Sequence, residues 1–321
     1  MKERQGRSRE KFRVAIVGCG KIAGGYDTPR RACRGKYRTH AAGYLADRRF
    51  KLVAACDTDD RVLRRFCGEW KIPAAHRNLE TMLKHERPDV VSVCVPTRAH
   101  RSVLEILSRY PIRLVFAEKP LTDGFRKGCA IAKLYRRRKI ALAVNYLRRW
   151  CPNHQKIKQI IDSRRLGRLR SFDAAYCGDL LNIGSHLIDL VQYLAGEIAA
   201  VRGEELILKG GVRGYLQCVK QDRFTLQLLF DRGLVSITRY GYVGECTAWQ
   251  GGKARVVFRF APPGRGIDSA MKFAVGNLAD HLCRRQALVS SASNALRTLA
   301  VCEAIGKSKR SGRTVRVSRS A

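Results

Sequence analysis

The stretch Val14-Ala15-Ile16-Val17-Gly18-Cys19-Gly20-Lys21-Ile22-Ala23 places four apolar residues directly before a Gly-x-Gly-x-x-Ala motif. A buried parallel strand that delivers a dinucleotide to the start of a helix has this pattern. In such a fold Gly18 permits a tight turn, Gly20 lets the backbone approach a pyrophosphate, and Ala23 lets the helix lie close to the strand. Short glycine motifs also occur in ordinary turns between a strand and a helix, so the rest of the chain has to supply the context.

An acidic residue after the next apolar strand supplies part of that context. Residues 50–56 form this second apolar run, and Asp57 follows it. In a dinucleotide-binding fold, an acid at this point accepts hydrogen bonds from the adenosine ribose hydroxyls and repels a 2′-phosphate, which favours NAD over NADP. Asp57 lies further from the glycine motif than the usual ~20 residues, and a basic insertion over residues 24–40 accounts for the difference. An aspartate that only caps the following helix is compatible with the same sequence.

The remaining apolar runs of the first half alternate with helical patterns. This alternation predicts a doubly wound parallel sheet, an α/β fold of the Rossmann type, in which ligands bind at the carboxyl ends of the strands. Polar motifs stand at these ends, at residues 96–100, 118–120 and 145–146. The expected strands are 14–17, 50–56, 89–96, 113–117 and 140–144, and the expected helices are 60–70, 97–107 and 123–137.

From Trp150 onward, the pattern changes to helices followed by short alternating strands with glycine-containing turns. This alternation predicts a C-terminal α+β domain with a large, mainly antiparallel open sheet that is covered on one face. The expected organisation is a flexible basic tail over residues 1–11, a dinucleotide-binding Rossmann domain over residues 12–144, and a substrate-binding and oligomerisation domain over residues 145–321. The chain length also favours two domains.

The chain carries 63 Lys and Arg against 27 Asp and Glu, for a formal net charge of +36. A nucleic acid or another polyanion would be attracted by such a charge, but a solvated surface without a specific partner has the same composition. The basic residues are scattered along the whole chain instead of forming one tail or stripe, which favours the solvated surface. Nucleic acid is therefore not an expected partner.

The twelve cysteines stand singly, without any Cys-x-x-Cys pair, which indicates neither a zinc site nor a redox motif. Single thiols favour a reducing compartment. No apolar run approaches the ~18 residues of a membrane-spanning helix, and the charged N-terminal stretch lacks the apolar region of a secretory signal. These features predict a cytoplasmic protein without a metal or a membrane partner.

Five motifs in a fixed order resemble the Gfo/Idh/MocA oxidoreductases, a family that includes glucose-fructose oxidoreductase and inositol 2-dehydrogenase. The resemblance covers nearly the whole chain, and residues 295–305 are similar to the family's last helix. The five motifs are Gly18 to Ala23, Asp57, Val95-Pro96-Thr97-Arg98-Ala99-His100, Glu118-Lys119-Pro120 and Gly184-Ser185-His186-Leu187-Ile188-Asp189.

The resemblance implies an NAD(P)-dependent hydride transfer at a carbinol carbon of a sugar, inositol or nucleotide sugar. Carried over from the family, Lys119 and His186 flank the substrate hydroxyl beside the nicotinamide. The chemistry needs such groups, because a base takes the hydroxyl proton while hydride leaves the carbon, and a cation stabilises the developing alkoxide. Lys119 can serve in either role if burial lowers its pKa, and we expect His186 to titrate in the useful range unaided.

The sequence departs from the family at Asn182, where many members carry an aspartate one helical turn before the histidine. An asparagine can orient a neighbour but cannot accept a proton as a base. The neighbourhood is similar to a subgroup that has asparagine here, carries the same insertion, and is associated with surface polysaccharide or nucleotide-sugar genes. Asn182 is therefore either a member of the catalytic group or a helix N-cap, and the sequence leaves both roles open.

The resemblance implies three overlapping sets of site residues. The expected catalytic residues are Lys119, His186 and Asn182. The expected cofactor-binding residues are Gly18, Gly20, Lys21, Ile22, Ala23, Asp57, Pro96, Thr97, His100, Glu118, Lys119 and Asn145. The expected substrate-binding residues are Lys119, Tyr146, Arg148, Arg149, Asn182, His186 and Asp189. Three residues of the insertion are candidates for a substrate lid, namely Tyr26, Asp27 and His40.

Several of these residues have a structural alternative. For Arg148 and Arg149 the alternative is a solvated surface role, and in the binding role they would attract an anionic substrate such as a nucleotide sugar. For Asp189 the alternative is packing between the domains, and for His100 it is a place in the first turn of a helix. Family members commonly form dimers or tetramers, so a homo-oligomer is expected by resemblance.

Two other functions stay open on the sequence. A non-catalytic NAD(P)-binding regulator would keep Asp57 and the glycine motif but lose the proton-transfer groups, and the presence of Lys119 and His186 argues against it. A basic nucleic-acid-binding protein on a Rossmann scaffold would use the charge of +36.

Overall fold

The stretch from Val14 to Val17 lies in an inner strand of a six-stranded parallel sheet in a computed structural model that describes residues 11–33, 35–262 and 266–318. Almost all of the expected basic tail lies outside the described residues. The strand order is β3-β2-β1-β4-β5-β6, so the order reverses between β1 and β4, where ligands bind in doubly wound folds. The strands are β1 (Phe12–Val17), β2 (Phe50–Cys56), β3 (Ala74–His76), β4 (Val90–Val93), β5 (Leu114–Ala117) and β6 (Ala141–Val144).

Helices cover both faces of this sheet, which explains why its strands are apolar throughout. Val14 and Ile16 face one side and pack with α2, α3 and α9, whereas Ala15 and Val17 face the other side and pack with α4, α5, α6 and α10. The helices formed by the first half of the chain are η1 (Lys21–Gly25), α1 (Pro29–Cys33), α2 (His40–Leu45), α3 (Asp60–Trp70), α4 (Leu79–Glu86), α5 (Thr97–Leu107) and α6 (Phe125–Arg138). The Rossmann prediction is confirmed, and β3, α4 and the two short helices α1 and α2 in and after the insertion are additional to it.

The second half of the chain forms a nine-stranded sheet in the order β14-β13-β12-β11-β7-β10-β9-β8-β15. All neighbouring strands are antiparallel except β10 and β7, which are parallel. The predicted, mainly antiparallel sheet is therefore confirmed. Its strands are β7 (Leu169–Tyr176), β8 (Ile198–Arg202), β9 (Glu205–Leu208), β10 (Arg213–Cys218), β11 (Phe224–Phe230), β12 (Gly233–Thr238), β13 (Val243–Gln250), β14 (Lys253–Phe260) and β15 (Val315–Arg316).

Helices pack on one face of the second sheet, where Phe172 and Leu228 are buried. Tyr215, Leu229 and Val256 share the opposite face and are 49%, 38% and 43% exposed, so that face is open. The helical elements of the second half are η2 (Leu147–Trp150), α7 (Pro152–Asp162), η3 (Leu180–Gly184), α8 (Ser185–Leu194), η4 (Arg239–Gly241), η5 (Ile267–Ser269), α9 (Ala270–Leu282) and α10 (Ala292–Ser311).

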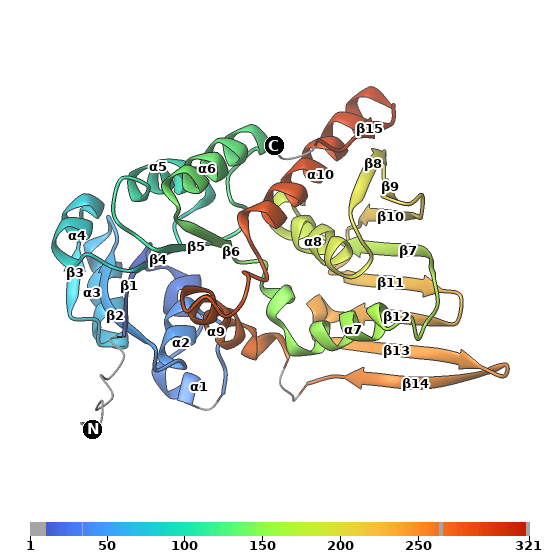
Figure 1. Cartoon of the computed structure of the whole chain (residues 1–321), viewed down its shortest axis with the longest axis horizontal. Helices are drawn as coiled ribbons and strands as arrows, with labels where there is room; N and C mark the ends of the chain where they lie inside the picture. Colours follow the sequence, from blue (N-terminus) through green and yellow to red (C-terminus); the bar gives the residue numbers. More distant parts are fainter. Residues whose placement is uncertain (1–10, 34, 263–265, 319–321) are drawn as a thin grey trace, which may run out of the picture.

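The last two long helices, α9 and α10, return to the first sheet, as their labels in Figure 1 show. Met271, Val275 and Leu278 of α9 belong to the core that covers β1 and β2. Helix α10 is divided between two cores, because Leu299 packs with the first sheet and Ile305 packs with the second. Residues 270–311 therefore join the two lobes, which we define as the parts of the molecule built around the first and the second sheet.

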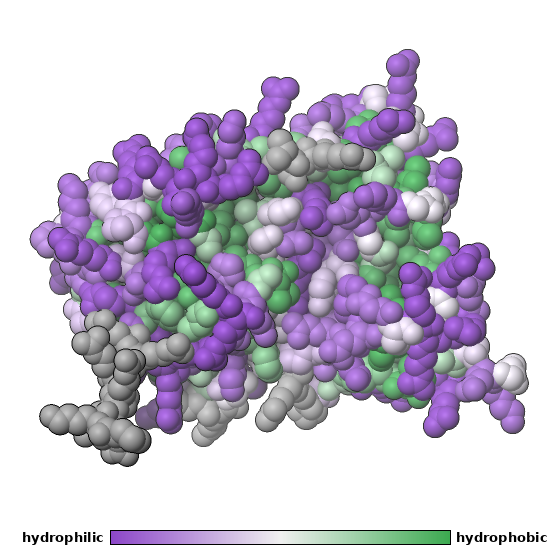
Figure 2. All heavy atoms as spheres, in the orientation of Figure 1, coloured by the Kyte–Doolittle hydropathy of each residue, from purple (hydrophilic) through white to green (hydrophobic). Residues whose placement is uncertain are grey.

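Hydrophilic side chains are spread over both lobes on the face shown in Figure 2, in keeping with the scattered basic residues of the sequence. None of the helices in the described ranges has both the length and the apolar character that a bilayer crossing requires.

Candidate active site

The glycine motif forms the turn between β1 and η1, and its two glycines are required for different reasons. Gly18 has a φ of +85°, and a Cβ added to it would lie 2.7 Å from the backbone of Cys94 and Val95. Gly20 has a φ of −77°, which any residue adopts, and an added Cβ would meet no atom within 4 Å. Protein packing thus requires glycine at position 18 but not at position 20. The open space beside Gly20 fits a ligand that approaches the backbone closely.

Lys21, Ile22 and Ala23 form the first part of η1, where Lys21 is exposed and Ala23 is buried. The helix is only one turn long because the glycines and Pro29 of the insertion interrupt it. Ala23 therefore packs under the turn, as expected, and is not available to a ligand.

Asp57 follows β2 and ties the glycine turn to it. Its Oδ2 accepts a hydrogen bond of 2.7 Å from the backbone N–H of Cys19, and its Oδ1 accepts one of 3.0 Å from the N–H of Asp59. The N-cap of α3 is Asp59, whose Oδ1 accepts from the N–H groups of Arg61 and Val62. The alternative that Asp57 caps this helix is therefore wrong. The Asp57 carboxylate remains partly exposed beside the turn.

The motif after β4 divides into an exposed and a buried part. Pro96 is exposed and Thr97 is partly exposed at the start of α5. His100 is buried, and its ring nitrogens lie 3.2 Å from the carbonyl oxygen of Leu121 and 3.0 Å from that of Val95. Since both nitrogens face backbone carbonyls, His100 joins the β4–α5 turn to the loop after Lys119 and has no free nitrogen for a ligand.

Lys119 reaches from the first lobe to the second. Its Nζ donates hydrogen bonds to the side-chain Oδ1 of Asn182 at 2.6 Å and to the backbone carbonyl of Asn182 at 3.0 Å. Burial is the largest influence on this ammonium and lowers its pKa, against the opposing charge of Glu118. The sequence-based condition for a proton-transfer role, a lowered pKa, is met.

Asn182 lies in η3, directly before α8, and its side chain is exposed apart from the contact with Lys119. The N-cap of η3 is Asp179, whose Oδ1 accepts a hydrogen bond of 2.7 Å from the backbone N–H of Asn182. The alternative that Asn182 is a helix N-cap is therefore wrong. Sequence reasoning missed Asp179, although an aspartate three residues before Asn182 is a usual capping pattern.

His186 is the second residue of α8, and its ring meets that of Tyr146 edge to face at 5.9 Å. Burial, together with the positive charges of Arg148 and Lys119, lowers the pKa of this imidazole well below its ordinary value. The expectation that His186 titrates in the useful range unaided is therefore wrong, and the imidazole is neutral at pH 7.

Arg148 is held inside the site and is not a solvated surface group. Its Nη2 and Nε donate to the backbone carbonyl of Tyr240 at 2.8 Å and 3.2 Å, and its guanidinium lies 4.3 Å from the ring centroid of Phe224. Burial lowers the pKa of Arg148 to about 10, so the group stays charged at neutral pH. Its partners come from β11 and η4, far along the chain, and no sequence pattern indicates them.

Arg149 and Asp189 are paired with each other. The Arg149 Nε lies 3.0 Å and 2.9 Å from the two carboxylate oxygens of Asp189, and the residues are 6% and 1% exposed. The guanidinium also lies 5.1 Å from the ring centroid of Tyr193. The ion pair is buried between η2 and α8, so the solvated surface role considered for Arg149 is wrong.

Glu118, Asn145 and Tyr146 stand at the ends of β5 and β6. Glu118 accepts hydrogen bonds from His40 and Asn145; burial alone would raise the pKa of this carboxyl, but these contacts keep it below its usual value. Asn145 Oδ1 and the Tyr146 hydroxyl are buried and have no hydrogen-bond partner within the described ranges. Buried polar atoms are nearly always partnered, so these two atoms indicate where a bound molecule would supply hydrogen bonds.

Within the insertion, two of the three lid candidates are structural. Asp27 is buried and accepts hydrogen bonds from the backbone N–H groups of Arg38 and Thr39 at 2.7 Å and 2.8 Å. His40 is fully buried, and only Tyr26, at 48% exposure, is free to contact a ligand.

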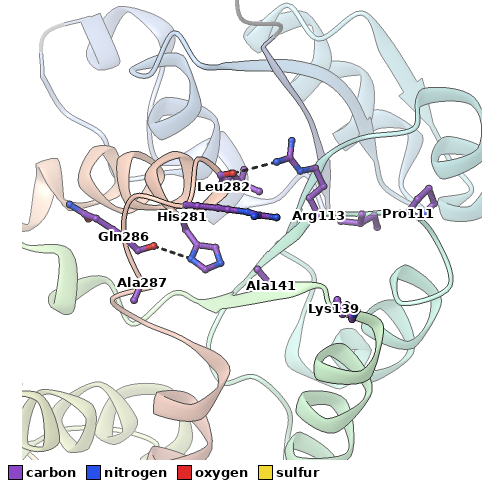
Figure 3. Close-up of a pocket in the computed structure, with 10 residues that line it drawn as sticks. Pro111, Arg113, Lys139, Ala141, His281, Leu282, Gln286 and Ala287 are labelled. Atoms are coloured by element: carbon purple, nitrogen blue, oxygen red, sulfur yellow. Dashed lines mark hydrogen bonds between the residues drawn. The ribbon is translucent and has the colours of Figure 1, made fainter.

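A separate hollow of about 660 Å³ lies at the opposite edge of the first sheet (Figure 3). Arg113, Lys139 and His281 line it near the amino ends of β5 and β6, and none of the expected site residues takes part. Among the described residues, no cluster of His, Cys, Asp or Glu could hold a metal ion.

The glycine turn, Asp57 and the parallel sheet define the first lobe as a dinucleotide-binding Rossmann domain. Residues 12–146 match a family model described as "Oxidoreductase family, NAD-binding Rossmann fold" (GFO_IDH_MocA). The family resemblance of the sequence is thereby confirmed.

Named relatives and solved structures are also similar to this chain. A 1-carboxy-3-chloro-3,4-dihydroxycyclohexa-1,5-diene dehydrogenase from Comamonas testosteroni is 28% identical over 203 residues, which are 57% of this chain and 47% of the relative. A D-apiose dehydrogenase from Paraburkholderia graminis is 23% identical over 253 residues, which are 74% of this chain and 62% of the relative. The chain thus spans about half to three fifths of these relatives' length.

The fold is shared over nearly the full chain with the WlbA dehydrogenase from Bordetella pertussis, solved in complex with NADH and UDP-GlcNAcA. That structure is 18% identical, has a TM-score of 0.76, and is aligned over 96% of this chain and 99% of the other. The likeness extends the fold assignment to the second lobe.

Proposed function

We propose that this protein is an NAD-dependent dehydrogenase that transfers hydride between nicotinamide and a secondary-alcohol carbon of a sugar or nucleotide sugar. The observation that carries the proposal is the contact between Lys119 and Asn182, which holds a partly buried amine of lowered pKa at the carboxyl edge of a Rossmann sheet. Relatives named as dehydrogenases of a sugar and a neighbour crystallised with NADH and UDP-GlcNAcA support the same chemistry.

The residues present fit a dinucleotide. The space beside Gly20 receives the pyrophosphate, and the partly exposed Asp57 accepts the ribose hydroxyls. When bound, the nicotinamide supplies the hydride acceptor or donor. Replacing Asp57 with Asn should remove the repulsion of a 2′-phosphate, so the ratio of NADP to NAD affinity should rise about tenfold in calorimetric titration. An unchanged ratio would contradict the role of Asp57.

Lys119 carries out the proton transfer of the reaction. In its neutral form the amine accepts the substrate hydroxyl proton, and in its charged form it stabilises the alkoxide. Asn182 orients the amine through its Oδ1, and because its amide cannot take a proton, the proton stays on Lys119. The neutral imidazole of His186 is available to accept a hydrogen bond from a substrate hydroxyl.

The charge of Arg148 indicates which class of substrate the site binds. Its two donors to Tyr240 and its stacking on Phe224 fix a charged guanidinium near Lys119 and His186, whose pKa values it lowers. Asp189, the nearest buried acid of α8, is already paired with Arg149. Among the described residues Arg148 forms no ion pair, and a fixed, unpaired positive charge favours an anionic substrate, such as a sugar acid or a nucleotide sugar.

The deciding experiment is a screen of neutral sugars, inositols, sugar acids and nucleotide sugars in both directions, followed by nicotinamide absorbance. With a substrate in hand, the Lys119→Ala variant should lose at least about a thousandfold in kcat while the Kd for NADH changes little. The matched control is Lys127→Ala, which removes an exposed ion pair with Asp123 and should retain wild-type turnover. Wild-type turnover by Lys119→Ala would overturn the mechanism.

We also propose that the protein works in the cytoplasm and as a homo-oligomer. Free thiols such as the buried Cys151 and the exposed Cys218 suit a reducing compartment. The exposed Tyr215, Leu229 and Val256 on the open face of the second sheet suit a contact between copies. Light scattering behind size-exclusion chromatography tests the assembly, since a monomer mass would contradict it.

A further inference from the structure

A chain of buried hydrogen bonds crosses the carboxyl ends of β4, β5 and β6. The Tyr44 hydroxyl lies 2.9 Å from Ser92 Oγ, which lies 3.0 Å from Nδ1 of His40. On the other side of the imidazole, Nε2 lies 2.9 Å from Oε1 of Glu118, and Nδ2 of Asn145 lies 2.6 Å from the same oxygen. All five residues are at most 9% exposed.

The carboxylate of Glu118 fixes the direction of the bonds around it. A carboxylate only accepts hydrogen bonds, so the Nε2–H of His40 and the amide N–H of Asn145 both donate to Oε1. Turning the Asn145 amide over would place its oxygen against Oε1 at the same short distance, which two acceptors do not tolerate. Glu118, held in turn by His40, therefore determines which end of the Asn145 amide is free.

The free end is Oδ1, which is the buried acceptor without a partner. A second buried asparagine provides the comparison. Asn277 Oδ1 accepts from Trp150 Nε1 at 3.1 Å and from the backbone N–H of Val289 at 3.0 Å, and its Nδ2 donates to the carbonyl of Ala287 at 3.0 Å. The fold thus supplies hydrogen-bond partners for both ends of the Asn277 amide, which has a structural role. It supplies no donor for the Oδ1 of Asn145.

We propose that Asn145 Oδ1 accepts a hydrogen bond from the carboxamide N–H of bound nicotinamide, and that His40 and Glu118 are positioning residues that lock this acceptor in place. The inference rests on the proposed function. Asn145 follows β6 next to the β5 end that carries Lys119, and hydride transfer requires the nicotinamide to lie beside that amine. At the nicotinamide end of the cofactor, the hydrogen-bond donors are the ribose hydroxyls and the carboxamide N–H.

The test uses the acetylpyridine analogue of NADH, in which an acetyl group replaces the carboxamide and cannot donate. Calorimetric titration of the full chain gives the ratio of the Kd for the analogue to the Kd for NADH. The wild-type protein should favour NADH about tenfold, because the analogue leaves a buried acceptor unpaired. Asn145→Ala should bind both dinucleotides with a ratio near one and should bind ADP-ribose as the wild type does.

The positioning role of His40 and Glu118 is tested with the same ratio of Kd values. Glu118→Gln and His40→Gln release the constraint on the Asn145 amide, so each should lower the ratio several-fold. Asn277→Ala is the matched control: it should lower the urea midpoint and keep the wild-type ratio, which separates a loss of stability from a loss of positioning.

Different failures have different meanings. A wild-type protein that binds no dinucleotide overturns the proposed function and this inference together. A protein that binds NADH but does not distinguish the analogue, or an Asn145→Ala variant that keeps the preference, overturns only the inference and points to a ribose hydroxyl as the donor.

Discussion

Burial sets the charge of single side chains in the second lobe. His154 of α7 is fully buried, with its ring nitrogens 3.2 Å and 3.1 Å from the carbonyl oxygens of Arg148 and Gly241. Desolvation, with the charge of Arg148, lowers the pKa of this histidine to about 4. It is therefore neutral in the folded protein at pH values where an unfolded chain already binds a proton.

The buried His154 should make the protein less stable in acid. The folded pKa of about 4 lies below the ordinary value of 6.5, so the unfolded chain binds more protons between these pH values. The stabilisation is complete above pH ~6.5 and is lost as the pH falls towards 4, by about 3 kcal/mol in total. The urea midpoint should fall accordingly between pH 7 and pH 5. His154→Gln should flatten this dependence only in part, because His186 shifts in the same direction. A wild-type midpoint that is constant over this range would contradict the account.

At the scale of elements, the turn between β1 and η1 separates folding from binding. Gly18 is needed by the fold, since its φ is positive and the backbone after β4 fills the space of a Cβ. Gly20 has an ordinary φ and an open flank, so its role belongs to the ligand. The two glycines of one motif therefore respond differently to the same substitution.

The same substitution should therefore have different effects at the two glycines. Gly18→Ala should destabilise the protein by about 2 kcal/mol or more, through strain and overlap with backbone atoms. Gly20→Ala should change stability by less than ~0.5 kcal/mol and weaken NADH binding roughly tenfold. Urea unfolding and calorimetric titration of both variants provide the measurement. Equal loss of stability in the two variants would show that the turn has no role specific to a ligand.

Elements whose pattern is local were predictable from the sequence, and contacts between distant elements were not. The apolar run before Gly18 and the acid at Asp57 place two neighbouring strands and their ligand edge. The hydrogen bond from Lys119 to Asn182 depends on how the lobes meet, and those from Arg148 to Tyr240 depend on how η2 packs against the second sheet. No periodicity encodes such pairs, because they join residues tens of positions apart in the chain.

The same limit explains the histidines. His100, His154 and His186 look alike in the sequence, but their surroundings differ: His100 and His154 lie against backbone carbonyls, whereas His186 lies beside the ring of Tyr146. The strand pattern also omitted β3, which has only three residues, and the short α4.

At the scale of the molecule, α10 makes the two lobes interdependent. Leu299 is 2% exposed in the first core and Ile305 is 5% exposed in the second, on one continuous helix (Figure 1). Unfolding either lobe would uncover part of the helix that the other lobe needs. The lobes should therefore melt together.

Substitutions at either end of α10 should therefore destabilise the whole molecule. Leu299→Ala and Ile305→Ala should each cost about 2 to 5 kcal/mol and lower the midpoint of one shared transition in scanning calorimetry. Two separate transitions, each moved by only one of the variants, would show that α10 does not couple the lobes.

Helix α9 has a practical consequence for anyone who expresses part of this protein. The segment 12–146 that matches the oxidoreductase family stops short of Trp150 and of α9, whose Met271 and Leu278 complete the core over β1. A truncated chain with those limits would present a bare apolar surface to water and should aggregate. A deletion design that keeps the nucleotide-binding half intact has to splice residues 266–291 back onto it.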